Sequence, residues 1–138
     1  MKKMINVTWR TNMKFTTEID GHTLTLDAAP DNGGNNDGPR PKALLMVALA
    51  GCTGMDVVSI LVKMRVELKY FNLKVEGDMR EEHPKKFEAM KIIYEFKGDN
   101  LDIEKLEKAV KLSIERYCGV YANLNDAMKM VYEIKILD

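Results

Sequence analysis

Two cysteines, Cys52 and Cys118, are the residues of this chain with the most distinctive chemistry. A thiolate is a strong nucleophile, and two thiols that meet in a fold can be oxidised together to a disulfide. A free cysteine titrates at about 8.5, so a nucleophilic role at neutral pH requires a nearby group that stabilises the thiolate. Cysteine is also among the most buried residue types, and composition alone favours two inert core thiols.

Cys52 lies in the most apolar segment of the chain, ALAGCTGMDVVSIL at 48–61, four residues before Asp56. This segment is part of a longer apolar run, 43–62, whose length could span a bilayer. A carboxylate near the middle and two glycines disfavour a membrane helix. We therefore predict a helix over 42–66 that is buried on most sides in a globular core, without a membrane.

Segments rich in β-branched and aromatic residues predict the strands. The expected strands are INVTW, KFTTEI and TLTLDA within residues 4–28, followed by 70–79, 87–98 and 129–137. Asp20-Gly21 predicts a tight hairpin turn between the second and third segments. The stretch at 29–41 is rich in Gly, Asn, Asp and Pro, which predicts a flexible loop.

A second helix is predicted over 102–117, where apolar residues recur at helical spacing. Gly119 is expected to end this helix, with a further helical turn at 123–128. Cys118 then lies at the negative end of a helix, which disfavours a thiolate there. The order of strands, helix, strands, helix and strand predicts one α+β domain over residues 1–138.

Charge and composition exclude several other classes of protein. The chain has 21 Lys and Arg and 21 Asp and Glu, and since no basic patch stands out we predict no nucleic-acid partner. The first residues, MKKMINVTW, lack the apolar core of a signal peptide, so a reduced, cytoplasmic setting is expected. His22 and His83 are isolated, and no phosphate-loop motif follows Gly33-Gly34, so we predict neither a metal nor a cofactor.

Three segments in this order resemble the OsmC/Ohr family of thiol-dependent hydroperoxide reductases. They are PKALLMVALAGCTGMDVVSIL at 41–61, MREEHPKKF at 79–87 and IERYCGVYANL at 114–124. The resemblance covers residues 5–138 and is closest to the OsmC-like branch of unassigned role. It implies an OsmC-like α+β fold, with antiparallel sheets wrapped around long central helices in an intertwined homodimer.

The resemblance also implies a thiol-dependent peroxidase activity. Cys52 would attack an organic hydroperoxide, and hydrogen peroxide is a further candidate substrate. Cys118 would resolve the sulfenic acid as a disulfide, which a dithiol electron donor would then reduce. The alternative is a small-molecule-binding or structural dimer that keeps the fold without peroxidase turnover.

This sequence departs from the family pattern just before the apolar run. Active members carry a glutamate there, paired with an arginine that activates the first cysteine, whereas this chain has Lys42 and Ala43. Arg10 and Arg40 are the candidate arginines. Ten residues of straight helix separate Cys52 from Lys42 by about 15 Å, so Arg10, or an arginine of a second subunit, is the better candidate. We expect weaker activity than in Ohr-type enzymes.

We also predict that Cys52 faces an apolar pocket at the dimer interface. Leu49 and Met55 are expected among the walls of this pocket, where they would contact the alkyl group of a hydroperoxide. Gly51 and Gly54 would let the substrate or a neighbouring backbone approach closely.

Overall fold

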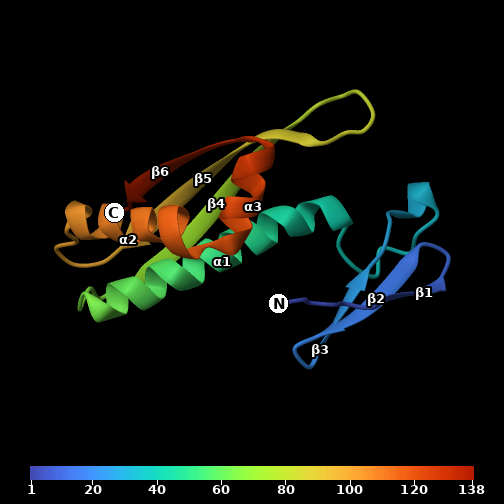
Figure 1. Cartoon of the computed structure of the whole chain (residues 1–138), viewed down its shortest axis with the longest axis horizontal. Helices are drawn as coiled ribbons and strands as arrows, with labels where there is room; N and C mark the ends of the chain where they lie inside the picture. Colours follow the sequence, from blue (N-terminus) through green and yellow to red (C-terminus); the bar gives the residue numbers. More distant parts are fainter. The chain divides into compact units, whose positions relative to one another are not determined.

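The computed structural model describes residues 1–138, which divide into two compact units, Met1–Leu45 and Met46–Asp138. Both units and their secondary structure are drawn in Figure 1. Strands and helices are both present, and the predicted α+β class is confirmed. The predicted single domain over residues 1–138 stays a prediction.

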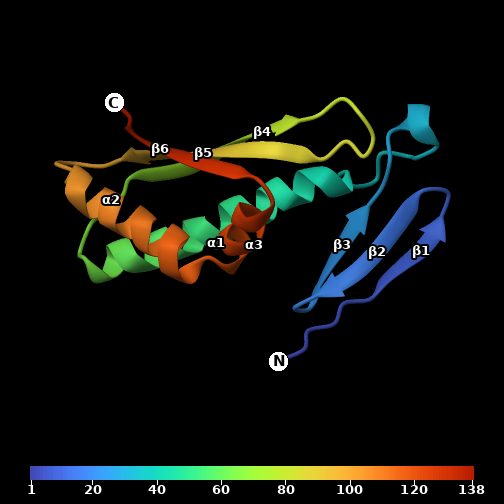
Figure 2. The same ribbon diagram turned by 45° about the horizontal axis from the view of Figure 1, so that its top comes forward.

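The first unit contains an antiparallel sheet of order β1-β2-β3 (Figure 2). Its strands are β1 (Val7–Thr11), β2 (Lys14–Ile19) and β3 (His22–Leu26). Asp20 and Gly21 both have positive φ angles, 51° and 81°, as a tight hairpin turn that matches the twist of the strands requires. The predicted turn is thus confirmed, while the first strand lies two residues later than INVTW, because Asn12, at φ 52°, makes the turn that follows it.

The loop after β3 is organised by one buried carboxylate. Asp27 accepts hydrogen bonds from the backbone N–H groups of Ala28, Asn35 and Asp37 at 2.7, 3.0 and 3.1 Å. Burial raises the pKa of Asp27, but these backbone donors outweigh it and hold the pKa below its ordinary value. The segment is thus a loop, as predicted, but it folds around Asp27 and includes a short 3₁₀ turn, η1 (Pro30–Asn32). Its flexibility stays a prediction.

The second unit contains a three-stranded sheet of order β4-β5-β6. Its strands are β4 (Tyr70–Met79), β5 (Phe87–Lys97) and β6 (Lys129–Ile136). Strands β4 and β5 are antiparallel, but β6 runs parallel to β5, so this sheet is mixed rather than wholly antiparallel. The helical crossover between β5 and β6 returns the chain to the end of the sheet where β5 began, which makes the last pair parallel.

The helical crossover has three parts. It consists of α2 (Ile103–Leu112), a π-helical turn η2 (Ser113–Tyr117) and α3 (Gly119–Ala127). Gly119 was expected to end a helix, but it begins α3, which is nine residues long rather than a single turn. The reason is Cys118, whose extended backbone (φ −76°, ψ 101°) interrupts the helical path and starts a new helix.

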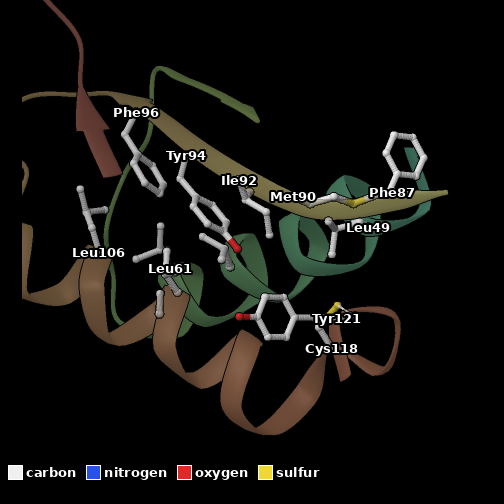
Figure 3. Close-up of a cluster of buried hydrophobic side chains, with 13 residues drawn as sticks. Leu49, Leu61, Phe87, Met90, Ile92, Tyr94, Phe96, Leu106, Cys118 and Tyr121 are labelled. Atoms are coloured by element: carbon white, nitrogen blue, oxygen red, sulfur yellow. Dashed lines mark hydrogen bonds between the residues drawn. The ribbon is translucent and has the colours of Figure 1, made fainter. Parts of the chain in front are cut away.

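The core of the second unit lies between the β4-β5-β6 sheet and the helices, which cover one face of that sheet (Figure 2). Alternate residues of β5 point into it, because successive side chains of a strand face opposite sides. The largest fully buried side chains come from β5 and from the facing helices: Tyr94, Phe96, Met90, Ile92, Leu49, Leu61 and Leu106 (Figure 3).

The long helix α1 (Pro41–Lys63) begins at a proline, which suits the first helical position. By length and composition it could cross a membrane, with a mean hydropathy of 2.0 in its most apolar window. However, Leu49, Val57 and Leu61 are at most 1% exposed in the core, as in the central helix of a globular unit. The opposite face of α1 is exposed to solvent in the single chain. The prediction that this helix is buried on most sides is therefore wrong for an isolated chain.

Candidate redox site

The structure brings the two cysteines together although they are far apart in sequence. Cys52 lies in the middle of α1 and is half-buried, while Cys118 lies between η2 and α3 and is 3% exposed. The side chains of Cys118 and Cys52 lie close enough to interact, and both thiols are free. Figure 3 shows Cys118 at the edge of the core, beside Tyr121. This arrangement gives one thiol with access to solvent and a second, buried thiol in contact with it.

Cys118 caps a helix. Its Sγ accepts a hydrogen bond from the backbone N–H of Tyr121 at 3.3 Å, as Ser, Thr and Asp side chains do at helix N-termini. Cys118 therefore follows the end of one helical segment, as predicted, and it also lies at the positive end of α3, which was not predicted. Burial nevertheless dominates, and together with Cys52 and Asp56 it outweighs the Tyr121 N–H and raises the pKa of Cys118 to about 11. At neutral pH this thiol is protonated.

A buried chain of hydrogen bonds runs beside the cysteines and ends on Asp56. Thr53 Oγ1 lies 2.7 Å from the hydroxyl of Tyr94 and 2.7 Å from Ser113 Oγ. Ser113 Oγ donates to Asp56 Oδ2 at 2.9 Å. Since each hydroxyl has one proton, Thr53 must donate to Ser113 and accept from Tyr94. Thr53 and Asp56, two polar residues of the apolar helix, are thus both bonded to Ser113 of the crossover.

Ser113 connects this chain to the second cysteine. Its carbonyl oxygen accepts the backbone N–H of Cys118 at 2.7 Å, across the five-residue spacing of a π-helical turn. Such turns are rare and occur frequently at functional sites. Sequence reasoning missed Ser113, Thr53 and Tyr94 as members of the site. The available signal was Thr53, a polar residue in an otherwise apolar helix, which needs a hydrogen-bond partner if it is buried.

Removing one member of this chain should lower stability. In Ser113→Ala or Thr53→Val a buried hydroxyl loses its partner, which costs about 1–3 kcal/mol of the free energy of unfolding. Urea unfolding followed by circular dichroism measures this loss. Ser59→Ala, at an exposed position of α1, is the matched control and should change stability by less than about 0.5 kcal/mol. Equal effects in all three variants would contradict a structural contribution from the chain.

An open apolar groove of about 560 Å³ lies between α1 and β4. It is lined mainly by Val47, Gly51, Gly54, Met55, Val58, Phe71 and Leu73. A Cβ atom on Gly54 would lie 3.1 Å from Leu73 Cδ1, so this glycine permits the close approach of α1 and β4. Met55 lines this groove, but Cys52 does not, so the groove is not the pocket that was predicted to face Cys52. Leu49 is also absent from its walls, because its side chain is fully buried in the core.

Residues 34–133 match the model of the family described as OsmC-like protein. The chain belongs to the OsmC-like family. Protein YhfA of Escherichia coli (strain K12) is 30% identical over 132 residues, which cover 95% of this chain and 96% of YhfA.

Solved structures confirm the OsmC-like fold. A hypothetical protein from Aquifex aeolicus VF5 is 31% identical and superposes with a TM-score of 0.82, covering 100% of this chain and 99% of that one. The organic hydroperoxide resistance protein OhrB of Bacillus subtilis is 18% identical with a TM-score of 0.67, covering 96% and 98%. The family that the cysteine segments indicated is therefore confirmed, and at 18% identity the likeness to OhrB shows the fold alone.

The start of α1 and the two candidate arginines are the remaining parts of the predicted site. Lys42 and Ala43 occupy the first turn of α1, which contains no acidic residue. Arg40 is tied to its own loop, donating from Nη1 to Asn36 Oδ1 at 2.6 Å and to the Gly38 carbonyl at 3.1 Å. Arg10, on β1, donates from Nε to Thr16 Oγ1 at 2.7 Å. Both arginines belong to the first unit and both cysteines to the second, so the role of Arg10 stays a prediction. No group of three or more His, Cys, Asp or Glu that could hold a metal ion occurs.

Proposed function

We propose that this OsmC-like protein is a thiol-dependent peroxidase that reduces organic hydroperoxides, with hydrogen peroxide as a second substrate. The observation that carries the proposal is the contact between Cys52 and Cys118, which differ in exposure. The half-buried Cys52 is the accessible nucleophile. Cys118 is buried and protonated, as suits a thiol that reacts only with its neighbour.

In the first step the Cys52 thiolate attacks the outer oxygen of the hydroperoxide. The O–O bond breaks, Cys52 becomes a sulfenic acid, and the alkoxide takes a proton and leaves as the alcohol. In the second step Cys118 attacks Cys52 Sγ, forming the S–S bond, while the sulfenic hydroxyl leaves with a proton as water. A dithiol donor then reduces this disulfide and is itself oxidised to a disulfide, so two electrons reach the peroxide.

We further propose that the working unit is a homodimer in the cytoplasm. The groove face of α1 supports this proposal, because Val47, Met55 and Val62 are 63%, 76% and 68% exposed in the single chain. A continuous apolar face of this kind marks an interaction surface in a globular protein. Arg10, or an arginine of the second subunit, is proposed to activate Cys52.

A small-molecule-binding or structural dimer without turnover is the second candidate. It is favoured by the first turn of α1, where Lys42 and Ala43 stand in place of a carboxylate that would hold an activating arginine. In this case the apolar groove would serve binding or assembly, and the cysteines would be core residues.

A peroxide assay separates the two candidates. The reduced protein is mixed with cumene hydroperoxide or with hydrogen peroxide, with dihydrolipoamide or dithiothreitol as the dithiol donor, and peroxide loss is followed. We expect catalytic consumption, faster with the organic hydroperoxide. Peroxide loss no faster than in the protein-free mixture, with every donor, would reject the peroxidase and favour the binding protein.

A further inference from the structure

We propose that the carboxylate of Asp56, tied to Cys118 through Ser113, opposes ionisation of the Cys118 thiol and so limits the rate at which this thiol forms the disulfide with oxidised Cys52. This inference rests on the proposed peroxidase function and assigns a role to a carboxylate that the two steps above leave unused. It would slow the second of those steps.

The backbone places Asp56 beside both cysteines. It follows Cys52 by four residues on α1, so the two side chains lie on neighbouring turns of the same helix face. Asp56 Oδ2 accepts from Ser113 Oγ at 2.9 Å, and the carbonyl of Ser113 accepts the N–H of Cys118 at 2.7 Å. One residue therefore holds both the carboxylate of Asp56 and the backbone of Cys118. Because Ser113 is fully buried, this connection is shielded from water.

The groups that face Cys118 come from three elements. From α1 they are Cys52 and Asp56, both of which repel a negative charge on Cys118. From β5, Tyr94 lies close enough to interact, but burial raises its pKa and it stays neutral. From α3 the backbone N–H of Tyr121 favours the thiolate. Burial and the two α1 groups prevail, and the pKa of Cys118 is raised accordingly.

Oxidation changes this balance. While Cys52 is a thiolate, Cys118 faces two negative groups, so its proton is retained and donated toward Cys52. When Cys52 becomes a sulfenic acid it is neutral, and the carboxylate of Asp56 is the charge that remains. The pKa of Cys118 then falls at the step in which its thiolate is needed. Asp56 sets how far it falls and hence the rate at which the disulfide forms.

The test removes this charge while keeping the hydrogen bond. Asp56→Asn can still accept from Ser113 through its amide oxygen, and Asp56→Ser is a second variant with a smaller side chain. Both are made in a Cys52→Ser background, where Cys118 is the one thiol, and thiolate absorbance is followed against pH. We expect the Cys118 midpoint to shift downward by about one pH unit, a ~10-fold larger thiolate fraction at a given pH. Asp126→Asn removes an exposed carboxylate from α3 and should leave the midpoint unchanged.

The outcomes are distinct from those of the peroxide assay. An unchanged or higher midpoint in folded Asp56→Asn and Asp56→Ser, judged by circular dichroism, would overturn the inference. So would an equal shift in Asp126→Asn. The titration contains no peroxide, so a wild-type protein that fails to consume hydroperoxide would reject the proposed function without altering this result. In the chain that retains Cys52, Asp56→Asn should also form the disulfide several-fold faster below pH 9.

Discussion

We expect Cys52→Ser to abolish the consumption of organic hydroperoxide, and Cys118→Ser to consume one equivalent per chain and then stop. Serine has nearly the shape of cysteine, but its hydroxyl does not ionise at neutral pH and is a poor nucleophile without a base. Cys52→Ser therefore loses the first step entirely. In Cys118→Ser the first step proceeds, and the sulfenic acid on Cys52 has no neighbouring thiol to resolve it. Stopped-flow mixing with a peroxide indicator distinguishes a full loss from a single burst.

The fate of Cys52 provides the internal check on this pair of variants. A sulfenic acid that persists in Cys118→Ser should be trapped by dimedone, and excess peroxide should carry it to sulfinic acid. Ser59→Ala changes a hydroxyl at an exposed position of the same helix and should retain wild-type turnover. Equal rates in Cys52→Ser and wild type, or a burst that depends on Cys118 alone, would reverse the assigned roles.

The second large effect is on assembly. Met55→Asp places a carboxylate at the most exposed apolar side chain of the α1 groove. In a homodimer joined through this face, each copy would bury an unpaired charge, which costs at least ~3 kcal/mol and weakens association more than about a hundredfold. Sedimentation velocity at low micromolar concentration should show a dimer for wild type and a monomer or unfolded chain for Met55→Asp.

Val131→Asp is the matched control for assembly. Val131 is an apolar residue of β6 and is 43% exposed. It pairs with Lys91, which alternates with the core-facing residues of β5. The side chain of Val131 therefore lies on the sheet face turned away from the helices. This variant should remain dimeric. A wild-type protein that is a stable folded monomer, or a Met55→Asp variant that is as dimeric as wild type, would contradict the proposed dimer.

Local patterns predicted the elements of the fold well where the pattern itself decides the structure. The apolar run gave the extent of α1 to within three residues at either end, because a long apolar segment with helical spacing has few other solutions. The turn at Asp20-Gly21 depends on two positive φ angles that those residues tolerate. The direction of β6 could not be read locally, since it depends on where the crossover returns the chain.

The candidate site was less accessible to local reasoning. Helix rules placed Gly119 as a stop signal, but they do not anticipate a cysteine whose sulfur caps the next helix. Ser113 and Thr53 each look ordinary in sequence, and they become partners through packing of the crossover against α1. The contact of the two cysteines followed from family resemblance, because no periodicity relates residues so far apart. A redox role for the two thiols must therefore be tested by their chemistry.

That chemistry is tested most directly by mapping the thiols after oxidation. The reduced protein is treated with one equivalent of cumene hydroperoxide, alkylated under denaturing conditions, digested without reduction and examined by mass spectrometry. We expect one intramolecular disulfide between Cys52 and Cys118, loss of both free thiols, and release of one equivalent of the alcohol. Both thiols intact after treatment, or Cys52 carried to sulfinic acid with Cys118 still free, would contradict it.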